Sequence, residues 1–145
     1  VGASLPLYES VTVIPGLLDV THVRNTGAAF GLLNSADLPM KWALMVGLAV
    51  VAIVAIGAYG ATLRADEKIA RAGLALVLGG AIGNLIDRAR LGYVLDFVDV
   101  YSGSWHFWAF NVADAAITVG AILVIFDLLG ASARAELRRH APHTV

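Results

Sequence analysis

The longest stretch without charge limits what this chain can fold into. Residues 42–63 contain no charged side chain and are rich in Ala, Val, Leu and Ile. A helix needs about 20 mostly apolar residues to cross the hydrocarbon core of a bilayer, so this stretch predicts a transmembrane helix. Only 14% of the 145 residues are charged, against about 25% in soluble domains. We therefore expect one integral-membrane domain over residues 1–145, and this length excludes a large soluble catalytic domain.

Two further stretches, residues 69–87 and 114–133, are candidates for spans. The first reaches bilayer thickness if the basic side chains near its start extend to the interface. The second contains Asp127, which has to face protein or lie near the interface. Gly79 and Gly83 form a pattern of small residues that predicts close approach by another helix. The predicted fold is a membrane all-α bundle with three transmembrane helices.

Basic residues indicate the orientation of these helices, because cytoplasmic flanks carry more of them. One side would hold Arg64, Lys68, Arg71, Arg134, Arg138 and Arg139, and the other Arg24, Lys41, Arg88 and Arg90. This bias places the 134–145 tail in the cytoplasm and residues 1–40 and 88–112 outside. The net charge of −1 argues against a nucleic-acid partner.

The outer segments contain signs of a small extracytoplasmic β-sheet. Residues 11–14 and 19–23 are rich in β-branched side chains and are separated by Pro15 and Gly16, a turn signal. Residues 101–110 carry Tyr, Trp and Phe side chains, as expected for an aromatic belt at the headgroup level.

Two acids near one membrane face are the candidates for chemistry. Asp96 lies among apolar neighbours, and Asp114 lies at the entry of the last span. Two carboxyl groups brought together at low dielectric share a proton, so that one can take a proton from water while the other binds a substrate carbonyl. Alternatively, Asp114 only favours the start of a helix, and Asp96 pairs with Arg88 or Arg90. Asp99 is interpreted as a solvated loop acid.

The sequence does not indicate a metal site or a phosphate-binding loop. The chain has no Cys. Two of its four histidines, His140 and His143, lie in the polar tail, and the other two, His22 and His106, are far apart in sequence. A metal site is therefore not expected. Gly79, Gly80 and Gly83 lie in an apolar helix without a Lys, so they do not form a phosphate loop.

Four motifs occur together in an order that resembles the lipoprotein signal peptidases, the type II signal peptidases of bacteria. They are RNTGAAFG at 24–31, GGAIGNLIDR at 79–88, VLDF at 94–97 and FNVAD at 110–114. The resemblance runs from about residue 11 to residue 129. The resemblance implies a fold with four transmembrane helices. This chain would then lack the first helix, which precedes the strand-like segment.

The resemblance implies an intramembrane aspartic peptidase that cleaves a prolipoprotein on the amino side of its diacylglyceryl-modified Cys. It implies a monomer without metal or cofactor, surrounded by lipid in the bacterial cytoplasmic membrane, with its active site at the extracytoplasmic face. The catalytic pair falls on Asp96 and Asp114. The residues that support the site or bind substrate are Asn25, Asn84, Arg88 and Asn111.

Two other functions remain open at this point. One is a truncated, non-catalytic membrane protein that binds lipoproteins or assists assembly. The other is a small transporter in which membrane acids relay protons, although here the acids gather at one face. If the chain is a peptidase, Trp105 and Trp108 are predicted to belong to a segment that covers the site.

Overall fold

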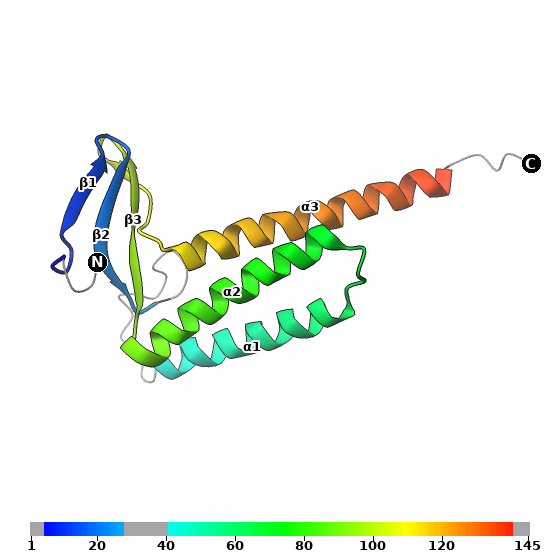
Figure 1. Cartoon of the computed structure of the whole chain (residues 1–145), viewed down its shortest axis with the longest axis horizontal. Helices are drawn as coiled ribbons and strands as arrows, with labels where there is room; N and C mark the ends of the chain where they lie inside the picture. The colour runs from blue at the N-terminus through cyan, green and yellow to red at the C-terminus, as the bar shows by residue number, and fades with distance from the viewer. Residues whose placement is uncertain (1–4, 28–40, 141–145) are drawn as a thin grey trace, which may run out of the picture.

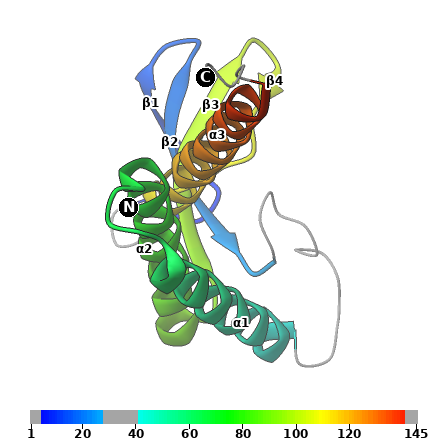
Figure 2. The ribbon, with the colours of Figure 1, turned by 90° about the vertical axis from the view of Figure 1, so that its right-hand side faces the viewer.

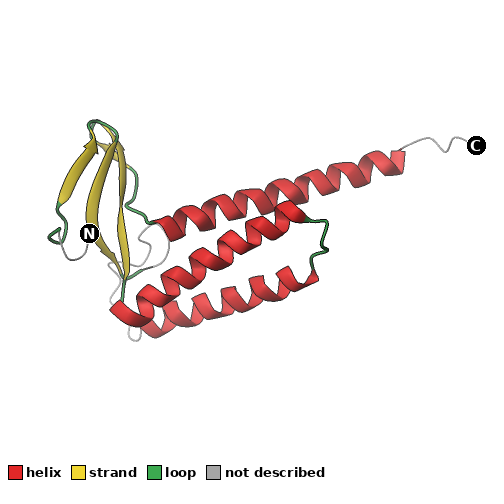
Figure 3. Ribbon diagram, in the orientation of Figure 1, coloured by secondary structure: helices red, strands yellow, loops and turns green. Residues whose placement is uncertain are grey.

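The computed structural model describes residues 5–27 and 41–140, which form a helix bundle with a small antiparallel sheet at one end (Figures 1 and 3). The helices are α1 (Lys41–Thr62), α2 (Lys68–Leu91) and α3 (Val112–His140). The strands are β1 (Ser10–Ile14), β2 (Leu18–Asn25), β3 (Val94–Ser102) and β4 (Trp105–His106), in the order β1-β2-β3-β4.

All three predicted spans are helices long and apolar enough to cross a membrane. The spans are Trp42–Thr62, Lys68–Leu91 and Val112–Gly130. Helix α2 packs against both α1 and α3 (Figure 2). The α1–α2 connection and the far end of α3 lie at one end of the bundle, and the sheet lies at the other (Figure 1).

Two predicted helix boundaries are wrong. Helix α2 does not end at residue 87 but continues to Leu91, because the stop signal is Gly92, which adopts the left-handed conformation (φ 80°) and donates its N–H to the carbonyl of Arg88 at 3.0 Å. Helix α3 continues to His140 and so includes much of the predicted tail. Arg88 therefore belongs to the last turn of α2 and not to the loop.

The close contact between α2 and α3 uses Gly73 and Gly80, and of the predicted pair only Gly83 lies near α3, where its Cβ would be 3.6 Å from that of Ala113. A Cβ atom on Gly73 would lie 2.7 Å from the carbonyl oxygen of Gly120, and one on Gly80 would meet the backbone of Ala113. A Cβ on Gly79, by contrast, would have no neighbour within 4 Å. Gly73 and Gly80 are two turns apart on one face of the helix, whereas Gly79 faces about 100° away from Gly80.

The predicted hairpin is confirmed. Gly16 has a φ of 76°, and the N–H of Leu17 donates to the carbonyl of Ile14 at 3.0 Å, as in a turn with Pro and Gly at its centre. Strand β3 was missed in the predicted loop 88–112, although the spaced β-branched residues Val94, Val98 and Val100 favour a strand. Its pairing with β2 brings Asp96 opposite Val23.

Candidate functional site

The polar residues that the sequence singles out meet where the sheet joins the helices. Asp96 is the third residue of β3, and Asp114 lies in the first turn of α3. Asp96 is 2% exposed, and Asn111, directly before α3, is 5% exposed. Burying such groups is costly unless hydrogen bonds replace those of water, so their contacts decide whether the arrangement is stable.

Asn111 connects the two aspartates. Its side-chain amide donates to Oδ1 of Asp96 at 2.8 Å, and its backbone N–H donates to Oδ2 of Asp114 at 3.1 Å. The same amide nitrogen lies 3.2 Å from Oδ1 of Asn84. One residue thus fixes two carboxyl groups that come from different elements of the fold.

A second amide holds the remaining oxygen of each carboxyl group. Nδ2 of Asn25, at the end of β2, donates to Oδ2 of Asp96 at 3.0 Å. Nδ2 of Asn84, on α2, donates to Oδ1 of Asp114 at 2.8 Å. All the carboxyl oxygens of the pair therefore accept a hydrogen bond, and two strands and two helices hold the site in place.

The start of α3 explains why the chain places Asp114 here. Oδ1 of Asn111 accepts a hydrogen bond from the backbone N–H of Asp114 at 3.0 Å, while Asp114 accepts from the N–H of Asn111. This reciprocal pair caps the helix N-terminus in the manner of a capping box. The helix-start interpretation of Asp114 is therefore correct, and the same carboxyl group also belongs to the polar cluster.

Arg88 brings a positive charge to the site. Its Nη2 donates to the carbonyl oxygen of Gly27 at 2.8 Å, and its Nη1 lies 3.4 Å from the carbonyl oxygen of Asn84. Within the described part of the chain, its Nε is buried and has no hydrogen-bond partner. Among the described residues no ion pair joins Asp96 to Arg88 or Arg90, so the ion-pair interpretation of Asp96 is wrong.

The environment of Asp96 alters its titration. Burial raises the pKa of Asp96 above its ordinary value of 3.8, while the hydrogen bonds from Asn25 and Asn111 work against the rise. The charge of Asp114 adds to the increase in pKa, and the charge of Arg88 lowers it. A carboxyl group with a raised pKa keeps its proton to a higher pH, which suits a pair that shares one proton.

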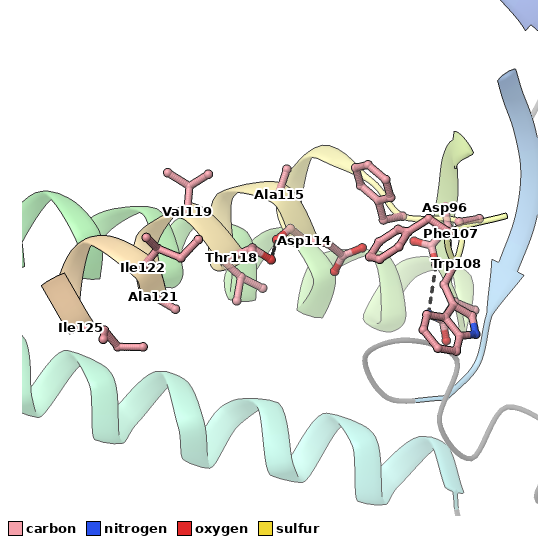
Figure 4. Close-up of a pocket in the computed structure, with 14 residues that line it drawn as sticks. Asp96, Phe107, Trp108, Asp114, Ala115, Thr118, Val119, Ala121, Ile122 and Ile125 are labelled. Atoms are coloured by element: carbon pink, nitrogen blue, oxygen red, sulfur yellow. Dashed lines mark hydrogen bonds between the residues drawn. The ribbon is translucent and has the colours of Figure 1, made fainter. Parts of the chain in front are cut away.

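A cavity of about 670 Å³ opens beside the two aspartates. Figure 4 shows Asp96 and Asp114 at one end of this cavity together with Phe107 and Trp108, and Ile125 at the other end. The rest of the lining is mainly apolar and comes from α3. The groove was not predicted from the sequence, although the apolar residues at helical spacing after Asp114 indicate it.

Other candidates lie apart from the site or have different roles. Asp99 is not a solvated loop acid: it lies on β3 and contacts Nδ1 of His106 at 2.8 Å. His22 is buried, and its Nδ1 lies 2.6 Å from the carbonyl oxygen of Leu5. The described residues contain no group of three His, Cys, Asp or Glu side chains that could hold a metal ion.

The fold and the site define a multi-pass membrane protein with a hydrogen-bonded pair of carboxyl groups at one end of its bundle. The structure is similar to that of a bacterial membrane enzyme, with a TM-score of 0.79 and 30% identity, over 92% of this chain and 78% of the other. A second bacterial membrane enzyme structure gives a TM-score of 0.78 and 28% identity, over 89% and 80% of the two chains.

The family follows from the sequence comparisons. The model of a family described as signal peptidase (SPase) II matches residues 2–130. The chain is 46% identical over 129 residues to the lipoprotein signal peptidase of Geobacter metallireducens, covering 89% of this chain and 78% of the relative. It is 52% identical over 122 residues to that of Maridesulfovibrio salexigens, covering 82% and 76%. This chain therefore belongs to the signal peptidase II family, as its four motifs predicted.

Proposed function

We propose that this protein is an aspartic endopeptidase that removes signal peptides from diacylglyceryl-modified prolipoproteins. Its family and the names of its relatives support cleavage of lipoprotein signal peptides. The observation that carries the aspartic mechanism is the bridge of Asn111 between Asp96 and Asp114 at the head of an apolar groove.

In the proposed reaction the aspartate pair carries one proton. The ionised carboxylate takes a proton from water, whose oxygen attacks the carbonyl carbon of the scissile peptide bond. The protonated carboxyl group donates a hydrogen bond to the carbonyl oxygen, on which negative charge develops. The tetrahedral intermediate then collapses: the C–N bond breaks, and a carboxyl group of the pair gives a proton to the leaving amine.

The amides and Arg88 have supporting roles in this proposal. The hydrogen bonds from Asn25, Asn84 and Asn111 keep the two carboxyl groups in a fixed geometry, which lowers the cost of organising the site during the reaction. Arg88 supplies positive charge near Asp96.

The groove gives a physical reason for acting on a lipidated substrate. From Asp114 to Ile125 a helix rises roughly 16 Å at about 1.5 Å per residue, which is about half the hydrocarbon thickness of a bilayer. An apolar substrate segment could thus stay at membrane depth while its peptide bond reaches the aspartates. This supports cleavage at the membrane surface.

The location of the enzyme completes the proposal. We place the aspartates and the sheet at the extracytoplasmic face of the bacterial cytoplasmic membrane, because Arg64, Lys68 and Arg71 lie at the opposite end of the bundle. The protein acts there as a monomer in contact with membrane lipid, without metal or cofactor.

A cleavage assay with a lipidated peptide tests this function. The purified chain in lipid vesicles is given a synthetic prolipoprotein peptide with a diacylglyceryl-modified Cys, and the products are identified by mass spectrometry. We expect one cut on the amino side of the lipidated Cys and much slower cleavage of the same peptide without lipid. Binding of the peptide without any cleavage would support a non-catalytic lipoprotein-binding protein instead.

A further inference from the structure

We propose that Asp99 and His106 are positioning residues that hold the aromatic segment 105–110 beside the aspartate pair. The inference rests on the proposed function, because the segment matters only if a substrate reaches Asp96 and Asp114. It gives a positioning role to Asp99 and His106, which lie outside the polar cluster around Asp96 and Asp114.

The backbone pairs the aromatic segment with β3 at both of its ends. At the far end Phe110 forms a bridge with Val98, whose N–H donates to the carbonyl of Phe110 at 2.8 Å and whose carbonyl accepts from the N–H of Phe110 at 3.0 Å. At the near end the pairing is short. The strand that begins it, Trp105–His106, has two residues, and His106 lies opposite Tyr101. The next backbone contact is the N–H of Phe107, which donates to the carbonyl of Val100 at 2.8 Å. A slip of one residue in such a short pairing would turn each side chain to the opposite face of the sheet.

The side chain of His106 adds two contacts to this short pairing at the near end of the segment. Its Nδ1 lies 2.8 Å from Oδ2 of Asp99, and its ring stacks on Tyr101 with centroids 5.1 Å apart and an interplanar angle of 14°. The side chain of Asp99 is 15% exposed and that of His106 is 52% exposed. Among the described residues, Oδ1 of Asp99 is buried without a partner, so His106 supplies the hydrogen bond to this carboxyl group.

The neighbouring strand strengthens the need for His106. Asp19 on β2 lies directly opposite Asp99 on β3, and like charges in such cross-strand positions are destabilising. Oδ1 of Asp19 is also buried without a hydrogen bond among the described residues. A donor at residue 106 offsets part of this repulsion, which ties the aromatic segment to the centre of the sheet.

When the side chain of His106 is held on one face of the sheet, the side chain of Phe107 points to the opposite face. In an extended strand the next side chain points to the opposite face, and Phe107, which follows His106, lines the cavity beside the aspartates. The chain is no longer a strand after His106, and Trp108 lines the same cavity. The ring of Phe107 lies 6.1 Å from that of Trp108 and 5.9 Å from that of Phe110. The Asp99–His106 contact therefore sets the position of an aromatic wall that meets the substrate.

Kinetics of peptide cleavage test this proposal. For His106→Ala and for Asp99→Ala we expect KM to rise about threefold to tenfold while kcat stays within about twofold, since substrate contacts weaken but the aspartates do not change. The double variant should be no worse than either single one, because both remove the same contact. His106→Gln, which keeps a side-chain N–H donor, should recover most of the loss.

A matched control separates positioning from folding. Ser104→Ala changes an exposed residue of the same β3–β4 turn and should leave KM unchanged. If the contact only stabilised the fold, the variants would lose active enzyme, so that kcat would fall with KM unchanged. That result would overturn the proposal.

A second measurement does not depend on catalysis. In a protein whose other tryptophans are replaced, Trp42→Phe and Trp105→Phe, the emission of Trp108 reports on the segment alone. Adding His106→Ala should increase quenching of Trp108 by acrylamide. A parent that fails to cleave but shows this increase would disprove the proposed function and support the positioning role, whereas unchanged quenching would contradict the positioning role whether or not the parent cleaves.

Discussion

Two buried regions of this molecule are held together in opposite ways. At the sheet end, side chains from β2, α2, β3 and α3 form the hydrogen-bonded cluster around Asp96 and Asp114. In the bundle, the backbones of α2 and α3 meet directly at Gly73 and Gly120. The second region has no reactive group, yet the same helix contact continues to Gly80 and brings Asn84, one turn further, within reach of Asp114. The proposed chemistry thus depends on the polar cluster, and the geometry of that cluster depends on the glycine contact.

The largest effect is expected from Asp114→Asn in the polar cluster. Cleavage of the lipidated peptide should fall by about 10⁴-fold, because the pair can no longer share a proton between two carboxyl groups. The helix cap should remain, since the amide oxygen can still accept the N–H of Asn111, while the hydrogen bond from Nδ2 of Asn84 is lost. Asp114→Ala, in comparison, should also lose about 1 kcal/mol of stability through the missing cap. Cleavage by Asp114→Asn at the parent rate would remove Asp114 from the mechanism.

Substitutions at the glycine contact should change the free energy of unfolding more than the rate of cleavage. Gly73→Ala places a Cβ atom 2.7 Å from a backbone oxygen of α3, so we expect a loss of about 2 kcal/mol. Gly79→Ala on the same helix meets open space and should gain about 0.5–1 kcal/mol from helix propensity. Thermal unfolding in detergent measures both, and equal shifts in the two variants would contradict the close contact.

A smaller effect on pH dependence is expected from Asn25→Ala. The hydrogen bond from Asn25 favours the charged form of Asp96, so its removal raises the pKa of Asp96 further. If ionised Asp96 is needed, the acid limb of the kcat/KM profile lies above the ordinary carboxyl range in the parent and moves to still higher pH in the variant. An acid limb that stays in place or moves to lower pH would argue against this role.

The same raised pKa has a consequence for stability. A buried acid that keeps its proton more tightly when folded stabilises the fold at low pH, and this stabilisation is lost as the pH rises through the folded-state pKa. Asp96→Asn should therefore flatten the decline of the unfolding midpoint above about pH 4. A parent whose midpoint rises across this range while Asp96→Asn shows no such rise would have a lowered pKa at Asp96 instead.

The smallest effect on rate is expected at the aromatic segment. Replacing Trp105 and Trp108 by Ala should slow turnover by about tenfold through lost substrate contacts, while the remaining cleavage still requires Asp96. Steady-state kinetics of the double variant measure this loss. Turnover equal to that of the parent would show that the segment does not cover the site.

The sequence predicted the parts of the molecule that follow from local patterns. Residues 42–63 predicted α1 because uncharged apolar length alone indicates a span, and Pro15 with Gly16 predicted the hairpin turn between β1 and β2. Asp96 and Asp114 were singled out by their predicted place near one membrane face, the resemblance of four motifs pointed to the same pair, and the structure brings both into one cluster.

The remaining features depend on contacts between distant segments. Which glycines meet another helix depends on how α2 is rotated, so the predicted pair of Gly79 and Gly83 was right only for Gly83, and the closest contacts are made by Gly73 and Gly80. Strand β3 was missed because its acids, Asp96 and Asp99, resemble a polar loop until β2 pairs with it. The bridge made by Asn111 was equally hidden, since its partners lie on β3, α2 and α3.

The most direct test of the central claim compares the parent with Asp96→Asn, Asp114→Asn and the double variant in one assay with the lipidated peptide. If the two aspartates act as one unit, each single variant should lose about as much activity as the double variant, with residual rates within about threefold of one another. Losses that multiply in the double variant, or a single variant that cleaves like the parent, would contradict an aspartate pair as the catalytic centre.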